Sequence, residues 1–94
     1  MSEQRYPVRG DLDLASASAV QQQLLLLVDQ SSDDLVLDCT GLDFIDSSGI
    51  AVFVHVQRVL ESQGRAFRVE HLTGGPRRVF DLLDLTDSLG IAPA

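Results

Sequence analysis

The apolar positions of this 94-residue chain change period from segment to segment, and these changes predict its secondary structure. Over residues 15–30 apolar side chains recur every three or four positions, which is typical of one face of an amphipathic helix. That face comprises Ala17, Val20, Leu24, Leu27 and Val28. Asp13 or Ser16 is suited to cap the start of this helix. Leu25 and Leu26 lie off the main face, and the pattern leaves open whether they enter the core or form an exposed patch.

The same period predicts two more helices. One runs from about Ser47 to Ser62 and is ended by Gly64. Its inner face is marked by Val52, Val56, Val59 and Leu60. The other begins at 74–76, where a proline suits the first turn of a helix. Its apolar side is formed by Val79, Phe80, Leu82 and Leu83.

Strands are predicted between the helices. Residues 35–39 form a continuous apolar run, as in a strand that is buried on both faces. Residues 65–71 alternate between apolar and polar, which indicates a half-buried strand. Residues 6–9 form a short strand whose proline disfavours a central position. Residues 11–14 either finish a strand or form a turn, and residues 40–45 are expected to be a connection.

Strands and helices therefore alternate along the chain. This order implies parallel strands joined by right-handed crossovers, which defines an α/β fold. We see no internal repeat, low-complexity tract or linker. The expected organisation is one domain over residues 1–94, with residues 1–5 flexible.

Composition and charge narrow the possible partners. An apolar fraction of 45% with 22% charged residues is typical of a globular protein. The net charge of −7 argues against binding to nucleic acid or to an anionic membrane, and it favours a partner with a basic or neutral face. Cys39 is the single cysteine, so no internal disulfide or zinc cluster is expected, and a cytoplasmic location is the default. No apolar run approaches the ~20 residues of a membrane span, and neither a signal peptide nor a cofactor is expected.

The segment Asp46-Ser47-Ser48-Gly49 is the strongest candidate site. It follows a strand and opens a helix, at the edge where α/β folds gather functional groups. The free amides of a helix start favour an anion by about 0.3–1 kcal/mol, and Gly49 leaves room for an approach to the backbone. An ordinary helix cap explains the acid but does not explain two hydroxyl groups.

The chain also contains residues that a serine nucleophile or a metal site would need. A serine nucleophile needs a base, but His55 lies two turns into the helix, and nothing in the spacing brings His71 to Ser48. The nucleophile elbow Gly-x-Ser-x-Gly is missing. Four acids could converge on a metal, although solvated carboxylates are the simpler explanation in an acidic chain: Asp11, Asp13, Asp38 and Asp46. We therefore predict no catalytic residue and no metal site.

Several of these stretches resemble the signature of STAS domains, which are named for sulfate transporters and anti-sigma factor antagonists. They are Gly10–Asp13, Leu35–Asp38, Phe44–Ile50 and, for the last helix and turn, 75–80 and 85–87. The resemblance extends from about Tyr6 to Ile91. It implies a small, mixed but mostly parallel sheet of about four strands, with helices mainly on one face.

The resemblance also implies a function. In anti-sigma factor antagonists the serine before the glycine is phosphorylated by a partner that is both the anti-sigma factor and a serine kinase of the GHKL ATPase type. Carried over, the acceptor is Ser48, with Ser47 as the alternative. The unmodified domain would bind the anti-sigma factor and free a sigma factor, phosphorylation would release it, and a phosphatase would reset the switch. The implied partner-binding residues are Asp13, Asp46, Ser47, Ser48, Gly49 and Ile50.

These observations lead to the hypothesis that Ser47 caps the helix and Ser48 is the switch. Phosphorylation would add about −1.5 to −2 charges at Ser48. Too few residues precede Tyr6 for the first hairpin of the family, so an exposed sheet edge could pair two copies of the chain. Two alternatives are a STAS subunit of an ABC-type lipid or anion transporter, docked on a cytosolic ATPase subunit, and a small serine hydrolase using Ser48 with His71.

Overall fold

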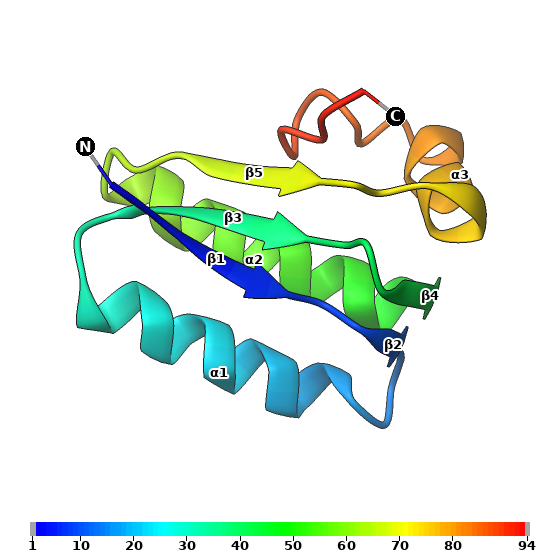
Figure 1. Ribbon diagram of the computed structural model, residues 1–94, viewed down its shortest axis with the longest axis horizontal. Coiled ribbons are helices and arrows are strands. Elements are labelled where there is room, and N and C mark those ends of the chain that lie inside the picture. The colour runs from blue at the N-terminus through cyan, green and yellow to red at the C-terminus, as the bar shows by residue number, and fades with distance from the viewer. Residues whose placement is uncertain (1, 94) are drawn as a thin grey trace.

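A computed structural model describes residues 2–93 of the chain, which form three helices and five strands (Figure 1). Their order is β1 (Glu3–Pro7), β2 (Gly10–Leu12), α1 (Ala17–Gln30), β3 (Asp34–Asp38), β4 (Leu42–Ile45), α2 (Ser47–Ser62), β5 (Phe67–Glu70) and α3 (Gly74–Leu82). Among these residues, none of the helices has the length and apolar character that crossing a membrane requires.

The strands form two parallel sheets. The larger has the order β1-β3-β5, and the smaller pairs β2 with β4. All three strand pairs are parallel, and α1 and α2 connect successive strands of the larger sheet. The pair β2–β4 lies beyond the carboxyl ends of β1 and β3 (Figure 1). The predicted α/β class is confirmed, with five strands in place of about four.

The core lies between the larger sheet and the helices α1 and α2. Leu35 and Leu37 of β3 belong to it, together with Leu24 of α1. Phe53 of α2 is fully buried and stacks on Phe80 of α3, with ring centroids 5.4 Å apart. Stacked aromatic rings are stabilising beyond the area that they bury. This pair therefore fixes α3 against the first half of α2, the half that begins at the predicted site.

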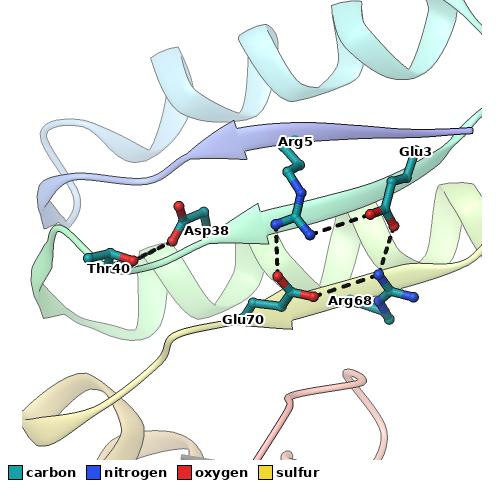
Figure 2. Close-up of polar contacts among 6 residues, drawn as sticks. All are labelled: Glu3, Arg5, Asp38, Thr40, Arg68 and Glu70. Carbon is teal, nitrogen blue, oxygen red and sulfur yellow. Dashed lines mark hydrogen bonds and ion pairs between the residues drawn. The ribbon is translucent and has the colours of Figure 1, made fainter.

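The opposite face of the sheet carries a ring of charges in place of helices (Figure 2). Arg5 lies 2.7 Å from Glu70 and 3.4 Å from Glu3, and Arg68 lies 2.7 Å from Glu3 and 3.6 Å from Glu70. Val36 sits between the two arginines in the strand register and is fully buried. The ring thus covers the middle strand and links β1 to β5 across it.

The chain differs from the sequence-based expectations at its start. Residues 3–5 were expected to be flexible but belong to β1, where Glu3 to Pro7 pair with β3. Ser2 accepts a hydrogen bond from the N–H of Asp34, which extends the pairing further. A backbone that is paired along its whole length is ordered even when its side chains are polar. Met1 lies outside the described residues.

Two short strands were also under-predicted. Residues 40–45 were expected to be a connection, yet they contain β4, and residues 11–14 resolve into the end of β2 followed by a turn. Both strands are short and carry acids among their apolar residues, so their periodicity is weak. In α3, Leu82 was expected on the apolar side but is 78% exposed. In α1, Leu25 packs partly on the core whereas Leu26 is 59% exposed.

The free side of β1 is poorly suited to pairing with another chain. Asp34 donates to Ser2 and Val8 donates to Asp38, so the even-numbered backbone groups of β1 face β3. The outward-facing backbone groups then belong to Glu3, Arg5 and Pro7, and proline has no N–H to donate. Charged side chains and proline are typical of protected edges. Dimerisation through this edge stays a prediction.

Candidate functional site

The site is built where β2 and β4 end together. Leu12 and Ile45 are partners in the parallel register, so the residues that follow them, Asp13 and Asp46, emerge side by side. The N–H of Asp46 donates to the carbonyl of Leu12 across this pair at 3.3 Å. The two acids that the sequence nominated therefore lie at one edge, at the starts of the segments leading into α1 and α2.

Asp46 caps α2. Its backbone is extended, and its carboxylate Oδ1 accepts hydrogen bonds from the N–H groups of Ser48 at 2.9 Å and Gly49 at 3.3 Å. A side chain that accepts from the first free amides of a helix is the usual N-cap arrangement. The hypothesis that Ser47 caps this helix is therefore wrong, because the acid before it does so. Neither serine hydroxyl is needed to start the helix.

Asp13 plays a similar part before α1. Its Oδ1 accepts from the N–H groups of Ala15 at 3.0 Å and Ser16 at 3.2 Å, which closes the turn that precedes the helix. Ser16 occupies the N-cap position without a side-chain cap, and its hydroxyl donates to the carbonyl of Asp11 at 2.8 Å. Of the two residues proposed to cap α1, Asp13 closes the preceding turn with its side chain, and its carbonyl accepts from the N–H of Ala17 at 2.8 Å.

Gly49 is where α2 touches the smaller sheet. A Cβ atom at this position would lie 2.6 Å from the carbonyl oxygen of Leu12 and 2.6 Å from Cγ1 of Ile45. The room at Gly49 is therefore filled by the chain itself, and the expectation that it admits an outside group is wrong. Gly49 is buried and Ile50 is only 8% exposed, so a partner could reach little of either.

The two serines differ in exposure. Ser47 is exposed and Ser48 is partly buried. Within residues 2–93, neither hydroxyl has a hydrogen-bond partner, whereas the amide of Ser48 is held by Asp46. Modification of either hydroxyl would therefore break no hydrogen bond within the described chain. Geometry alone leaves both serines as candidates.

A shallow groove between α1 and α2 begins at this site. It has a volume of about 500 Å³ and includes Ser47 and Ile50 near the helix start, with His55 and Arg58 further along. Gln21, Ala51 and Val54 complete its lining. His55 is exposed on the helix surface, two turns beyond Ser47. The groove is open and carries both an apolar and a cationic surface.

The other histidine lies among acids. His71 follows β5 with a φ of 61°, beside Glu70. Hydrogen bonds from the hydroxyl and amide of Thr40 (Figure 2) hold the pKa of the Asp38 carboxyl below its usual value, and the proximity of His71 adds to this effect. Within the described chain, no hydrogen bond joins His71 to Ser48. The geometry gives no support to a serine–histidine pair.

Metal binding has no support in the described part of the chain either. Among residues 2–93, no group of three or more histidine, cysteine or acidic side chains is close enough to hold an ion. The four acids considered from the sequence are divided between different tasks. Asp13 and Asp46 start helices, whereas Asp38 bonds to Thr40.

A parallel α/β domain with an acid-capped serine pair at the start of its second helix has the architecture of a STAS domain. The sequence matches the family described as "Mlab, STAS domain" over residues 3–91. The chain therefore belongs to the STAS domain family, and the resemblance seen in the sequence is confirmed.

Proteins named as anti-sigma factor antagonists are similar to this chain in sequence and in structure. The "Anti-sigma-B factor antagonist" of Bacillus subtilis (strain 168) is 29% identical over 85 residues, which cover 90% of this chain and 77% of the relative. An anti-sigma factor antagonist from Mycobacterium paratuberculosis has a similar structure, with a TM-score of 0.87, 24% identity, and coverage of 98% of this chain and 78% of that one.

The Bacillus protein SpoIIAA is similar in both of its solved forms, at 19% identity. Its unphosphorylated structure has a TM-score of 0.83 and covers 99% of this chain and 80% of that one. The phosphorylated structure has a TM-score of 0.74, with coverage of 98% and 82%. At this level of identity the likeness of the structures establishes the fold.

Proposed function

We propose that this domain is an anti-sigma factor antagonist that works as a binding switch through Ser48. In its unmodified form it binds an anti-sigma factor that is also a serine kinase of the GHKL ATPase type, and a sigma factor is freed. Phosphorylation of Ser48 releases the complex, and a phosphatase restores the unmodified form. The names of the relatives support this role, as does the existence of SpoIIAA in a phosphorylated form.

The observation that carries the proposal is the position of the two serines, which directly follow the capping residue Asp46 at the start of α2 and whose hydroxyls have no hydrogen-bond partner within residues 2–93. Between the two serines, Ser48 is chosen because it is the serine before the glycine, as in the family motif. In the proposed step the Ser48 Oγ attacks the γ-phosphorus of ATP. The Oγ–P bond forms as the bond to the bridging oxygen breaks, the hydroxyl proton passes to a base of the kinase, and ADP leaves.

The cap at Asp46 shapes what the phosphate does. The amides of Ser48 and Gly49 are already bound to Asp46 Oδ1, so a phosphate on Ser48 cannot use them unless it displaces that carboxylate. The new charge of about −1.5 to −2 therefore adds to existing negative charge at the site. An uncompensated charge buried in an interface costs several kcal/mol, and about 3 kcal/mol corresponds to a hundredfold loss of affinity.

The charge of the chain is consistent with this partner. With a net charge of −7, the domain suits a partner that presents a basic face to Asp13 and Asp46. Arginine or lysine on the partner would be attracted to the unmodified site. Such residues would also contact a phosphate, so release requires that the docked geometry leave no room for it.

A phosphorylation assay tests the proposal. The purified domain is incubated with ATP and each kinase-type anti-sigma factor of the same cell, and the modified residue is mapped by mass spectrometry. Ser47→Ala is the matched control for Ser48→Ala, because the two serines are neighbours in the same helical turn. We expect label on Ser48 that only Ser48→Ala removes. Label on Ser47 alone would move the switch to its exposed neighbour.

The same assay separates the alternatives. A STAS subunit of an ABC-type lipid or anion transporter would take no label from any of these kinases and would instead bind a cytosolic ATPase subunit. A small serine hydrolase would cleave acyl esters, and Ser48→Ala would abolish that cleavage. Within the described chain no hydrogen bond joins a histidine to Ser48, so nothing in the geometry favours the hydrolase.

A further inference from the structure

A second hollow opens beside the site, between β4 and the start of α3. It has a volume of about 200 Å³, and its lining is almost entirely apolar. The lining residues are Asp43, Phe44, Ile45, Gly75, Pro76 and Val79. Phe44 is 50% exposed, so half of its side chain is available to a partner at the hollow.

The packing of the fold explains why Phe44 is left at the surface. Leu42 and Ile45 of β4 are buried, at 7% and 3% exposure, and they contribute to the core. Phe80 is the residue by which α3 enters the same core, and it is fully buried. Phe44 projects beside α3 instead, with Val79 partly buried next to it. The core is complete without the exposed part of Phe44.

One carboxylate lines the hollow and a second lies on the neighbouring strand. Asp43 is exposed and forms part of the lining. Asp11, also exposed, is the partner of Phe44 in the register of β2 and β4. The hollow and the serine site are both formed by β4 and its continuation, because Phe44 and Ile45 line the hollow and Asp46 follows Ile45 directly. An apolar pocket with one acid in its lining and a second on the adjacent strand complements an apolar side chain that is flanked by basic ones.

We propose that this hollow anchors the anti-sigma factor. It receives one apolar side chain of that partner, and arginine or lysine residues beside it pair with Asp43 and Asp11. The proposal rests on the proposed function and adds a division of labour to it. The hollow supplies affinity through burial of Phe44, whereas Ser48 controls whether the complex persists. Central apolar anchors with a polar rim are typical of the residues that dominate binding energy.

The experiment measures binding of the purified anti-sigma factor by calorimetry for four domains. These are the wild type, Phe44→Ala, Asp43→Asn and the control Leu26→Ala. Leu26 is 59% exposed on α1 and has no part in the hollow, so its truncation removes a comparable apolar surface elsewhere. We expect Phe44→Ala to weaken binding by about tenfold or more and Leu26→Ala by less than about twofold.

Asp43→Asn keeps the test independent of the folding of Phe44→Ala, because it changes only an exposed side chain. We expect this variant to bind more weakly at low salt and to show a shallower salt dependence than the wild type. Thermal unfolding of each variant identifies any loss of binding that follows from unfolding. Wild-type affinity and salt dependence in Asp43→Asn would overturn the pairing with basic residues.

Other outcomes overturn the anchor itself. Wild-type affinity in a folded Phe44→Ala domain would do so. A second such outcome is that Phe44→Ala loses self-association in sedimentation while it binds the partner as the wild type does, because the occupant would then be a second copy of the chain. Phosphorylation of the wild type separates the two proposals. If Ser48 is labelled while Phe44→Ala binds normally, only the anchor fails. If no kinase-type anti-sigma factor binds or labels the wild type, the proposed function fails with it.

Discussion

Gly49 offers the sharpest test of how the start of α2 packs against β2 and β4. Replacement by alanine would place a Cβ atom 2.6 Å from the carbonyl oxygen of Leu12, 2.6 Å from Cγ1 of Ile45 and 2.8 Å from Cγ of Leu12. Ordinary contacts of a Cβ lie at 3.4 Å or more. The start of α2 must therefore move away from β2 by roughly 0.8 Å, or the strand must yield, since a backbone oxygen cannot rotate aside.

Two effects set the size of the change in stability. Overpacking of this kind costs about 1–3 kcal/mol, whereas alanine is preferred over glycine inside a helix by about 1 kcal/mol. Because the obstacle is backbone, the upper part of the overpacking cost applies, about 2–3 kcal/mol, and subtracting the helix preference leaves a destabilisation of about 1–2 kcal/mol for Gly49→Ala. In a domain of this size that corresponds to a fall in melting temperature of about 4–16 °C.

Gly75→Ala is the matched control. Gly75 lies in the first turn of α3, and a Cβ there would meet nothing within 4 Å. The same substitution without the clash should be neutral or stabilising by up to about 1 kcal/mol. Urea unfolding followed by circular dichroism measures both variants. A Gly49→Ala domain as stable as the wild type would refute the proposed contact between α2 and β2.

Three further predictions concern groups whose roles the structure defines. Asp46→Ala should lose about 0.5–2 kcal/mol of stability in urea unfolding, because two helix amides lose their cap, whereas Asp46→Asn should lose less; equal losses would contradict the capping role. Burial raises the pKa of the Cys39 thiol to about 12, so Cys39 should resist iodoacetamide at pH 8 and react only after unfolding; rapid alkylation of the folded protein would contradict this. The hydrogen bond from Arg5 lowers the pKa of Glu70, so folding favours the charged form of Glu70. The stabilising contribution of Glu70 should be present above the pKa that Glu70 has in the unfolded chain, about 4.3. It should disappear as the pH falls through the lower pKa that Glu70 has in the folded domain. Arg5→Met should therefore reduce stability at pH 7 more than at pH 3, and an equal reduction at both would refute the link.

The helix that carries the site was predictable from the sequence. Its bounds, Ser47 to Ser62, are those expected, since a regular apolar period lies between an acid–serine start and a glycine stop. The capping residue was not predictable. Asp46 and Ser47 are both residue types that cap helices well. The cap is the residue with the extended backbone, and the packing of the helix on the rest of the domain determines which residue that is.

The role of Gly49 was equally hidden. The sequence shows a glycine, but the reason for it is Leu12, which β2 brings against the helix from far away in the chain. The exposure of Phe44 was hidden for a similar cause, because β4 is too short to reveal which side of it faces the core. Contacts between distant segments carry no local signal in one sequence.

The start of β1 was missed for a different reason. Glu3 and Arg5 look like a polar terminus, yet they belong to the charged ring on the sheet face that no helix covers in the described chain. A strand on that face needs no apolar residues there to be ordered. The alternation of charge in Arg68 and Glu70 of β5 is the matching half of the ring. The sequence of either strand alone does not indicate that the other strand carries the oppositely charged partners.

In the proposed switch, one phosphate on Ser48 ends the binding of an anti-sigma factor. The most direct test compares the dissociation constants of the purified anti-sigma factor for the unmodified and the Ser48-phosphorylated domain, both in the Ser47→Ala background so that only one hydroxyl can carry the group. We expect the phosphorylated domain to bind at least about a hundredfold more weakly. Equal affinity of the two forms would contradict the switch, even if Ser48 proves to be the residue that is modified.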